Sequence, residues 1–198
     1  MLKEINIDWL DDIDKAKAES ARTGRPILMF FHYKLCQGCI NTFERTLPKM
    51  SVSNEITENF VPVLLETSER LVDVAKYRVD WTPTFIVADD TAHEIMRWEG
   101  FLPEDDFLAQ LAMAEAKVAF KMQDYANAER LFDLVLLKFP LTDLAPEAVY
   151  YQGVTKYKAS MNPVWLKRAY ESLRGSYPGS VWTLKASVFS GEKMTKAA

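Results

Sequence analysis

Two cysteines, the only two in this chain of 198 residues, stand close together in the stretch Cys36-Gln37-Gly38-Cys39. A C-x-x-C pair occurs in reactive dithiols and in metal sites, and free cysteines are also common in protein cores. A dithiol exchanges disulfides with a substrate, whereas two thiolates supply only half of a tetrahedral zinc site. The residues around the pair have to separate these three possibilities.

The neighbouring residues favour a reactive dithiol. The apolar run Pro26–His32 predicts a buried strand, and apolar residues at helical spacing after Cys36 predict a helix that Pro48 kinks or ends. Cys36 would then lie where the unpaired N–H groups of a helix start face its sulfur, which lowers the pKa of a thiol. Cys39 would lie one turn further and close enough to attack a mixed disulfide formed at Cys36.

Two other interpretations of the pair stay open. A metal site would need two further ligands, for which the chain offers His32, His93 and carboxylates, or a second chain. A pair of buried core thiols is the other alternative. His32, four residues before Cys36, either biases the protonation of the dithiol or is a partly buried, hydrogen-bonded residue at the end of the strand.

The first half of the chain alternates strand and helix patterns. Strands are predicted at 26–32 and 60–66, and a hairpin over 84–100 is predicted to turn around 89–92, with helices between these segments. This order predicts an α/β sheet with helices on its faces. Because 48% of the residues are hydrophobic, the chain has enough apolar surface to bury such a core.

From Pro103 onward the chain carries only helix patterns. Two segments, Tyr125–Pro140 and Pro163–Pro178, both end in an aromatic residue followed by proline and are offset by 38 residues. This offset is close to the period of helical-hairpin repeats. The predicted helices cover about 104–122, 125–138, 145–160, 163–175 and 181–190.

Acidic and basic side chains are also distributed unevenly between the two halves of the chain. Residues 1–108 carry 12 basic and 20 acidic side chains, whereas residues 109–198 carry 12 and 8. This difference supports two modules of different character. We therefore predict two domains, at 1–111 and 112–198.

An ordered set of motifs between about Trp9 and Leu111 resembles the thioredoxin superfamily, most closely the branch that includes the C-terminal domain of the transmembrane disulfide interchange protein. Besides C-x-x-C, the set comprises Trp9, RTGRP, ILMFF, FVPV, WTPTF and EGFLPEDDFLAQL. The resemblance implies a thioredoxin fold, which is a central mixed sheet with flanking helices. The expected fold class is thus α/β, followed by an all-α region of tetratricopeptide-like helical hairpins.

The resemblance also implies roles for single residues. Cys36 would be the exposed attacking thiol and Cys39 the buried resolving thiol. Pro83 would be a cis-proline beside them, and Thr82 would offer its backbone to a peptide substrate. Trp81, next to this bend, would either line the substrate groove or cover the core.

The chain departs from the family pattern next to the dithiol. Leu35 stands where members usually have a tryptophan, and the inner pair of the C-x-x-C is Gln-Gly instead of Gly-Pro. Phe30 stands where many thioredoxins have a buried aspartate that helps to move the proton of the resolving thiol. These differences bear on redox potential and rate, and leave the dithiol itself intact.

The expected function is that of an enzyme, a thioredoxin-type thiol–disulfide oxidoreductase that uses its C-Q-G-C dithiol on protein substrates and holds a protein partner on its helical region. The alternative is a thioredoxin-like scaffold or adaptor that binds a partner through its helical repeats, with weak or no redox catalysis. Neither function needs a cofactor or a metal. The chain shows no secretory signal, no apolar stretch of ~18 residues and no concentrated basic face. We therefore expect a cytoplasmic protein that binds neither membrane nor nucleic acid, as a monomer or an oligomer.

Overall fold

A computed structural model describes residues 7–191 of the chain. It divides into two compact units, of which the first ends at Val118 and the second begins at Ala119. This division lies inside helix α5 (Glu104–Lys121), a few residues after the domain boundary expected from the sequence. The helix continues through the division without a break, so no separate linker segment joins the two units.

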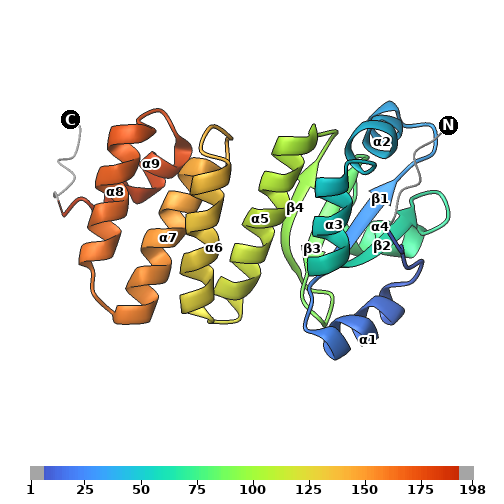
Figure 1. The fold of residues 1–198 in the computed structure, drawn as a ribbon, viewed down its shortest axis with the longest axis horizontal. Coiled ribbons are helices and arrows are strands. Elements are labelled where there is room, and N and C mark those ends of the chain that lie inside the picture. Colours follow the sequence, from blue (N-terminus) through green and yellow to red (C-terminus); the bar gives the residue numbers. More distant parts are fainter. Residues whose placement is uncertain (1–6, 192–198) are drawn as a thin grey trace. The chain divides into compact units, whose positions relative to one another are not determined.

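The first unit contains a four-stranded mixed sheet, as expected (Figure 1). Its strands are β1 (Ile27–His32), β2 (Val61–Glu66), β3 (Thr84–Ala88) and β4 (Glu94–Glu99). Their order across the sheet is β2-β1-β3-β4, with β1 parallel to β2 and antiparallel to β3, and β3 antiparallel to β4. Pro62 lies in the edge strand β2, where the missing N–H of proline is tolerated.

Local signals in the sequence set the ends of the helices. The side chain of Asp12 accepts hydrogen bonds from the first N–H groups of α1, and Gly24 ends this helix with a φ of 75°. The helix that begins after Cys36 ends before Pro48, as predicted. The helices of this unit before α5 are α1 (Ile13–Thr23), α2 (Gln37–Asn41) with its π-helical continuation η1 (Thr42–Thr46), α3 (Met50–Asn59) and α4 (Leu71–Tyr77).

Adjacent residues of β1 build two separate cores, because side chains alternate between the faces of a strand. Phe31 lies in a cluster with Ile13 of α1 and Tyr77 of α4. Phe30 faces the other side, where its ring stacks on Phe85 at 4.3 Å. Phe30 is fully buried, so the place of the family's aspartate is taken here by an apolar core residue.

The second unit is helical, as the sequence predicts (Figure 1). Gly153 of α7 allows a close helix crossing, because a Cβ added there would lie 2.3 Å from the Cβ of Ala169 in α8. An aromatic contact between Tyr150 and Trp182, with ring centroids 5.1 Å apart, joins α7 to α9. Whether these hairpins are tetratricopeptide-like stays a prediction. The elements are α6 (Tyr125–Lys138), α7 (Ala145–Ser160), α8 (Val164–Ser176), α9 (Val181–Ala186) and the short helix η2 (Ser187–Phe189).

Candidate active site

Cys36 lies at the junction of a strand and a helix, where the sequence places it. β1 ends at His32, and the turn that follows is closed by a hydrogen bond of 2.9 Å from the Cys36 N–H to the carbonyl oxygen of Tyr33. Cys36 is the N-cap of α2, and its Sγ accepts a hydrogen bond of 3.3 Å from the Cys39 N–H. The sulfur thus takes the place of the oxygen that usually caps a helix start.

The bend at Thr82 and Pro83 lies directly beside this sulfur. The peptide bond between these two residues is cis, as the resemblance implies. The Sγ of Cys36 donates a hydrogen bond of 3.1 Å to the carbonyl oxygen of Thr82. The Gly100 N–H donates to the carbonyl oxygen of Pro83 at 2.8 Å and anchors the bend. Two segments that are far apart in the sequence therefore meet at one sulfur atom.

Gly38 permits this close approach. A Cβ added at this position would lie 2.9 Å from the Cδ of Pro83, which is too close for two carbon atoms. We expect Gly38→Ala to lower the free energy of unfolding by about 1–3 kcal/mol, the usual cost of overpacking. The measurement is the shift of the thermal denaturation midpoint, followed by circular dichroism.

Gly175→Ala is the matched control for this prediction. Gly175 also lies in a helix, α8, but a Cβ added there meets nothing within 4 Å. Without a clash, the change from glycine to alanine in a helix is expected to stabilise by about 0.5–1 kcal/mol. Equal shifts in the two variants would show that Pro83 does not restrict position 38.

The two thiols differ in burial and in ionisation. Burial alone would raise the pKa of Cys36, but hydrogen bonds from the side chains of Thr82 and Cys39 and from the N–H groups of Cys39 and Gly38 outweigh it and lower this pKa. Cys39 is buried, and burial raises its pKa to about 11. Cys36 is therefore the thiol that ionises first, while Cys39 stays protonated at neutral pH. Environments that push two pKa values apart are typical of residues with different roles in one reaction.

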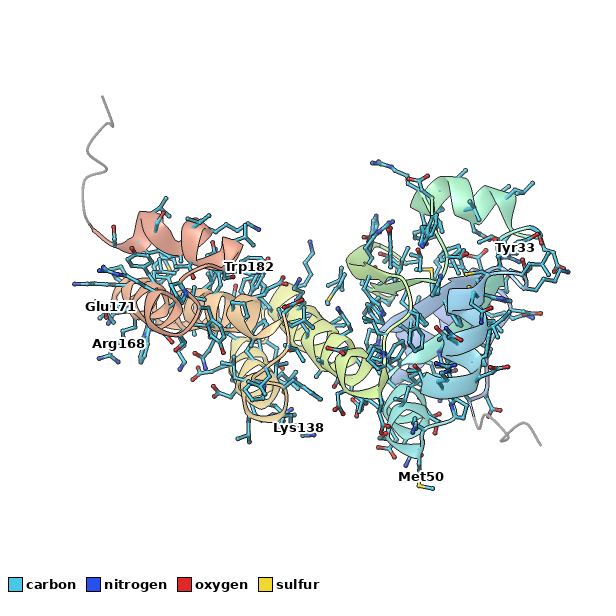
Figure 2. The ribbon with its side chains drawn as sticks, turned by 90° about the horizontal axis from the view of Figure 1, so that it is seen from above. Tyr33, Met50, Lys138, Arg168, Glu171 and Trp182 are labelled. Carbon is cyan, nitrogen blue, oxygen red and sulfur yellow. The ribbon has the colours of Figure 1, made fainter. Side chains whose placement is uncertain are left out.

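A groove with a volume of about 760 Å³ opens beside Cys36. Trp81 lines it and is 66% exposed, so this side chain does not cover the core. Tyr33 also lines it and projects from the surface after β1 (Figure 2). The complete lining is Tyr33, Cys36, Gln37, Gly38, Thr67, Ser68, Val79, Asp80, Trp81, Thr82, Pro83, Gly100 and Phe101.

Glu66, which the sequence analysis did not single out, is a partly buried charged residue beside the turn that precedes Cys36. It lies opposite His32 at the ends of the parallel strands β2 and β1, and its carboxylate accepts a hydrogen bond of 3.1 Å from the Lys34 N–H. The signal that could have found it is the common end of two adjacent parallel strands. His32 is partly buried, but its Nδ1 makes no hydrogen bond to any residue within 7–191.

The geometry gives no support to a metal site within one chain. Within the described part of the chain, no group of three or more histidine, cysteine, aspartate and glutamate side chains could hold a metal ion. His93, one of the ligands considered above, lies in the turn between β3 and β4 and is hydrogen-bonded to Thr91. The two cysteines are free thiols.

Comparison with known families identifies the first unit. A family model with the description "Thioredoxin-like domain" matches residues 13–115, more than half of the 198 residues. The chain belongs to the thioredoxin-like domain family. This thioredoxin-like domain contains the sheet, the dithiol and the cis bend.

Solved structures of other proteins are similar to part of this chain. The DsbH oxidoreductase is 16% identical with a TM-score of 0.50, and the match covers 55% of this chain and 84% of that chain. At this identity the likeness shows the fold alone. A thioredoxin from Thermus thermophilus is 26% identical with a TM-score of 0.48, and the match covers 53% of this chain and 84% of that chain. The C-terminal domain of DsbD from Neisseria meningitidis is 16% identical with a TM-score of 0.44, and the match covers 51% of this chain and 94% of that chain.

Two further findings concern curated relatives and membrane-spanning helices. The search among curated proteins finds no match to it. Among the helices of residues 7–191, none is long and apolar enough to cross a membrane. The cytoplasmic location expected from the sequence stays a prediction.

Proposed function

We propose that this chain is a thiol–disulfide oxidoreductase of thioredoxin type that acts on protein substrates, with Cys36 as the nucleophile and Cys39 as the resolving thiol. One observation carries the proposal. The two sulfurs of a single C-x-x-C have opposite pKa shifts, and the one with the lowered pKa lies at a helix start beside the Thr82–Pro83 bend. A thiolate is the attacking species in disulfide exchange.

The reaction proceeds in two exchanges. The Cys36 thiolate attacks a substrate disulfide, whose S–S bond breaks, so that a mixed disulfide forms and one substrate sulfur leaves as a thiolate. Cys39 then loses its proton and attacks the Sγ of Cys36. The mixed disulfide breaks, the second substrate thiolate leaves, and a Cys36–Cys39 disulfide remains. Two electrons pass from the dithiol to the substrate, and the reverse sequence oxidises a substrate dithiol.

The groove beside Cys36 supports a peptide segment as the substrate. Its wall includes Trp81, whose exposed ring offers a large apolar surface, and Thr82. No residue within the described ranges accepts a hydrogen bond from the Thr82 N–H, so this group is available to a peptide carbonyl. A backbone hydrogen bond at Thr82 would hold a substrate cysteine next to Cys36 without selecting its side chains.

The variant Cys39→Ser tests the proposal. It keeps the nucleophile but lacks the resolving thiol, so we expect covalent complexes with substrate proteins to accumulate. The measurement is electrophoresis without reductant, after mixing the variant with a disulfide-containing protein such as insulin. The complexes should disappear when dithiothreitol is added.

The double variant Cys36→Ser/Cys39→Ser is the matched control, and it should form no such complex. If Cys39→Ser traps no more protein than this control, the proposed enzymatic function is wrong.

A second candidate function is binding of a protein partner by the helical unit. Three apolar residues near its C-terminal end, Val181, Leu184 and Val188, are exposed. Their spacing puts them on one side of α9 and η2, so they form an apolar strip. If the trapping experiment fails, a thioredoxin-like scaffold that binds a partner through this unit becomes the better interpretation.

A further inference from the structure

The groove beside Cys36 carries a negative charge of its own. Among the described residues that line it, Asp80 is the only acidic or basic one. Asp80 is exposed and stands two residues before Thr82, whose carbonyl oxygen accepts the hydrogen bond from Cys36. A carboxylate therefore lies in the groove, close along the chain to the contact with the reacting sulfur.

The carboxylate of Asp80 is available to a substrate. In the described part of the chain, it forms neither a hydrogen bond nor an ion pair. The pKa of Arg97 is raised mainly by a hydrogen bond to Glu94, and attraction to Asp80 adds only a minor part. This guanidinium donates its hydrogen bonds to Glu94 and to the carbonyl oxygens of Tyr77 and Arg78. It therefore leaves Asp80 free to pair with a cation from another molecule.

The next residue, Trp81, offers an aromatic face in the same groove. Its side chain is 66% exposed, and within the described residues neither an aromatic ring nor a basic side chain stacks on it. Trp165 of α8 is different, because Lys156 and Arg168 lie over its ring at 5.1 and 4.9 Å from the centroid. An arginine guanidinium pairs with a carboxylate and also stacks on an aromatic ring, so a carboxylate beside a free indole suits it.

The charge of the first unit favours the same kind of substrate. Residues 1–108 carry 12 basic and 20 acidic side chains. Glu69 and Glu99, each next in the chain to a residue that lines the groove, are exposed. Lys34 is exposed in the turn before Cys36, but it does not line the groove. A surface with a net negative charge attracts basic segments and repels acidic ones.

We propose that the groove selects substrate segments with a basic side chain, above all arginine, close to the reacting cysteine, and that Asp80 and Trp81 are the specificity-determining residues. This inference rests on the proposed function, because the selection acts on the disulfide that Cys36 attacks. The guanidinium pairs with the carboxylate of Asp80, while its flat face lies on the indole of Trp81. Acidic substrates, such as glutathione disulfide, are disfavoured because the same carboxylate repels them.

The test uses three peptides, each with one cysteine joined to 2-thiopyridine by a disulfide. They differ only in the residues two positions before and two positions after the cysteine, which are arginine, glutamine or glutamate. Attack of the Cys36 thiolate on the cysteine sulfur breaks the S–S bond and releases pyridine-2-thiolate, which takes up a proton to give the absorbing thione. The rate of release reports the first exchange alone. The same reactions with 2-mercaptoethanol give the selectivity of a thiolate without a groove.

The unaltered protein should prefer the arginine peptide. At low salt, we expect its ratio of the arginine rate to the glutamate rate to exceed that of 2-mercaptoethanol by about tenfold, the lower end of the effect of electrostatic steering. The glutamine peptide should lie between the two. At about 1 M salt, where the Debye length is about 3 Å, the ratio should approach that of 2-mercaptoethanol.

Asp80→Asn should lower this ratio by about fivefold, the upper end of the effect of an exposed ion pair. Asp90→Asn is the matched control, because it removes the same charge from an exposed residue at the opposite end of β3 from Thr82. It should leave the ratio within about 1.5-fold. A change in the reactivity of Cys36 cancels, since only ratios between peptides are compared.

Trp81→Leu separates the aromatic face from simple apolar contact. Leucine keeps an apolar surface but has no ring, so the arginine peptide should react about threefold more slowly and the glutamine peptide within about 1.5-fold of the unaltered protein. If both peptides slow equally, Trp81 does not determine specificity.

The inference is overturned if the unaltered protein has the same ratio as 2-mercaptoethanol, or if Asp80→Asn leaves the ratio unchanged. In both cases the peptides would still react with Cys36, and the proposed function would stand. If the protein releases the thione from none of the three peptides faster than Cys36→Ser/Cys39→Ser does, the proposed function itself is wrong.

Discussion

Replacing Cys36 by serine is expected to reduce the turnover of a disulfide substrate by about 10⁴- to 10⁶-fold, the range that follows the loss of a residue of the nucleophilic machinery. A serine hydroxyl stays protonated at the helix start that lowers the pKa of the Cys36 thiol. Cys39 does not replace it as nucleophile, because burial raises the pKa of this thiol to about 11. The measurement is the reduction of insulin by dithiothreitol, which should fall to the rate without protein.

Cys39→Ser is the control, because it should keep the first exchange, at Cys36, and lose only the second. Cys39→Ser should lose turnover as well, but its Cys36 should still form the mixed disulfide at a rate within about threefold of that of the unaltered protein. If both variants lose the first exchange equally, the assignment of Cys36 as the nucleophile is wrong.

Replacing Phe85 by alanine is expected to lower the free energy of unfolding by about 3–5 kcal/mol. Phe85 is 1% exposed, and its ring stacks on Phe30 at 4.3 Å and on Trp98 at 5.2 Å. The ring of Phe107 is nearly perpendicular to that of Phe85, with ring centroids 4.9 Å apart. The substitution would leave a cavity among rings from two strands, β1 and β4, and one helix, α5. The measurement is the midpoint of urea denaturation, followed by circular dichroism.

Val72→Ala is the control for this prediction. Val72 is 82% exposed on α4, so the loss of two methyl groups there should change the free energy of unfolding by at most about 0.5 kcal/mol. Equal midpoints for Phe85→Ala and Val72→Ala would show that the stacked rings do not stabilise the first unit.

The order of strands and helices could be predicted from the sequence because it depends on neighbouring residues. The apolar run before the first cysteine forms β1, and Pro48 lies just beyond the helix that begins after Cys36. In the second unit, the predicted helices 125–138 and 145–160 have the same bounds in the structure. The position of Cys36 at a helix start follows from these local signals as well.

Other features depended on resemblance to a family. The cis bond before Pro83 and its place beside Cys36 follow from the WTPTF motif only if the thioredoxin fold is assumed. The boundary between the two units was harder to predict from the sequence, because α5 runs through it and carries no local signal of a domain end. For Trp81, the sequence left two places open. In the structure its exposed side chain lines the groove beside Cys36, and its contact with a substrate stays a prediction.

The sequence by itself determined that two thiols, one turn apart at a helix start, belong to an α/β domain followed by helices. Only the tertiary structure decided which groups surround these thiols. His32 and Glu66 meet because two parallel strands end in register, and Gly38 lies against Pro83 because a helix start packs on a distant bend. Such contacts join residues that are far apart in the chain, whereas periodicity and capping signals report only on neighbours. The pKa values of both thiols also depend on the folded structure, through burial and through the contact with Thr82, 46 residues after Cys36.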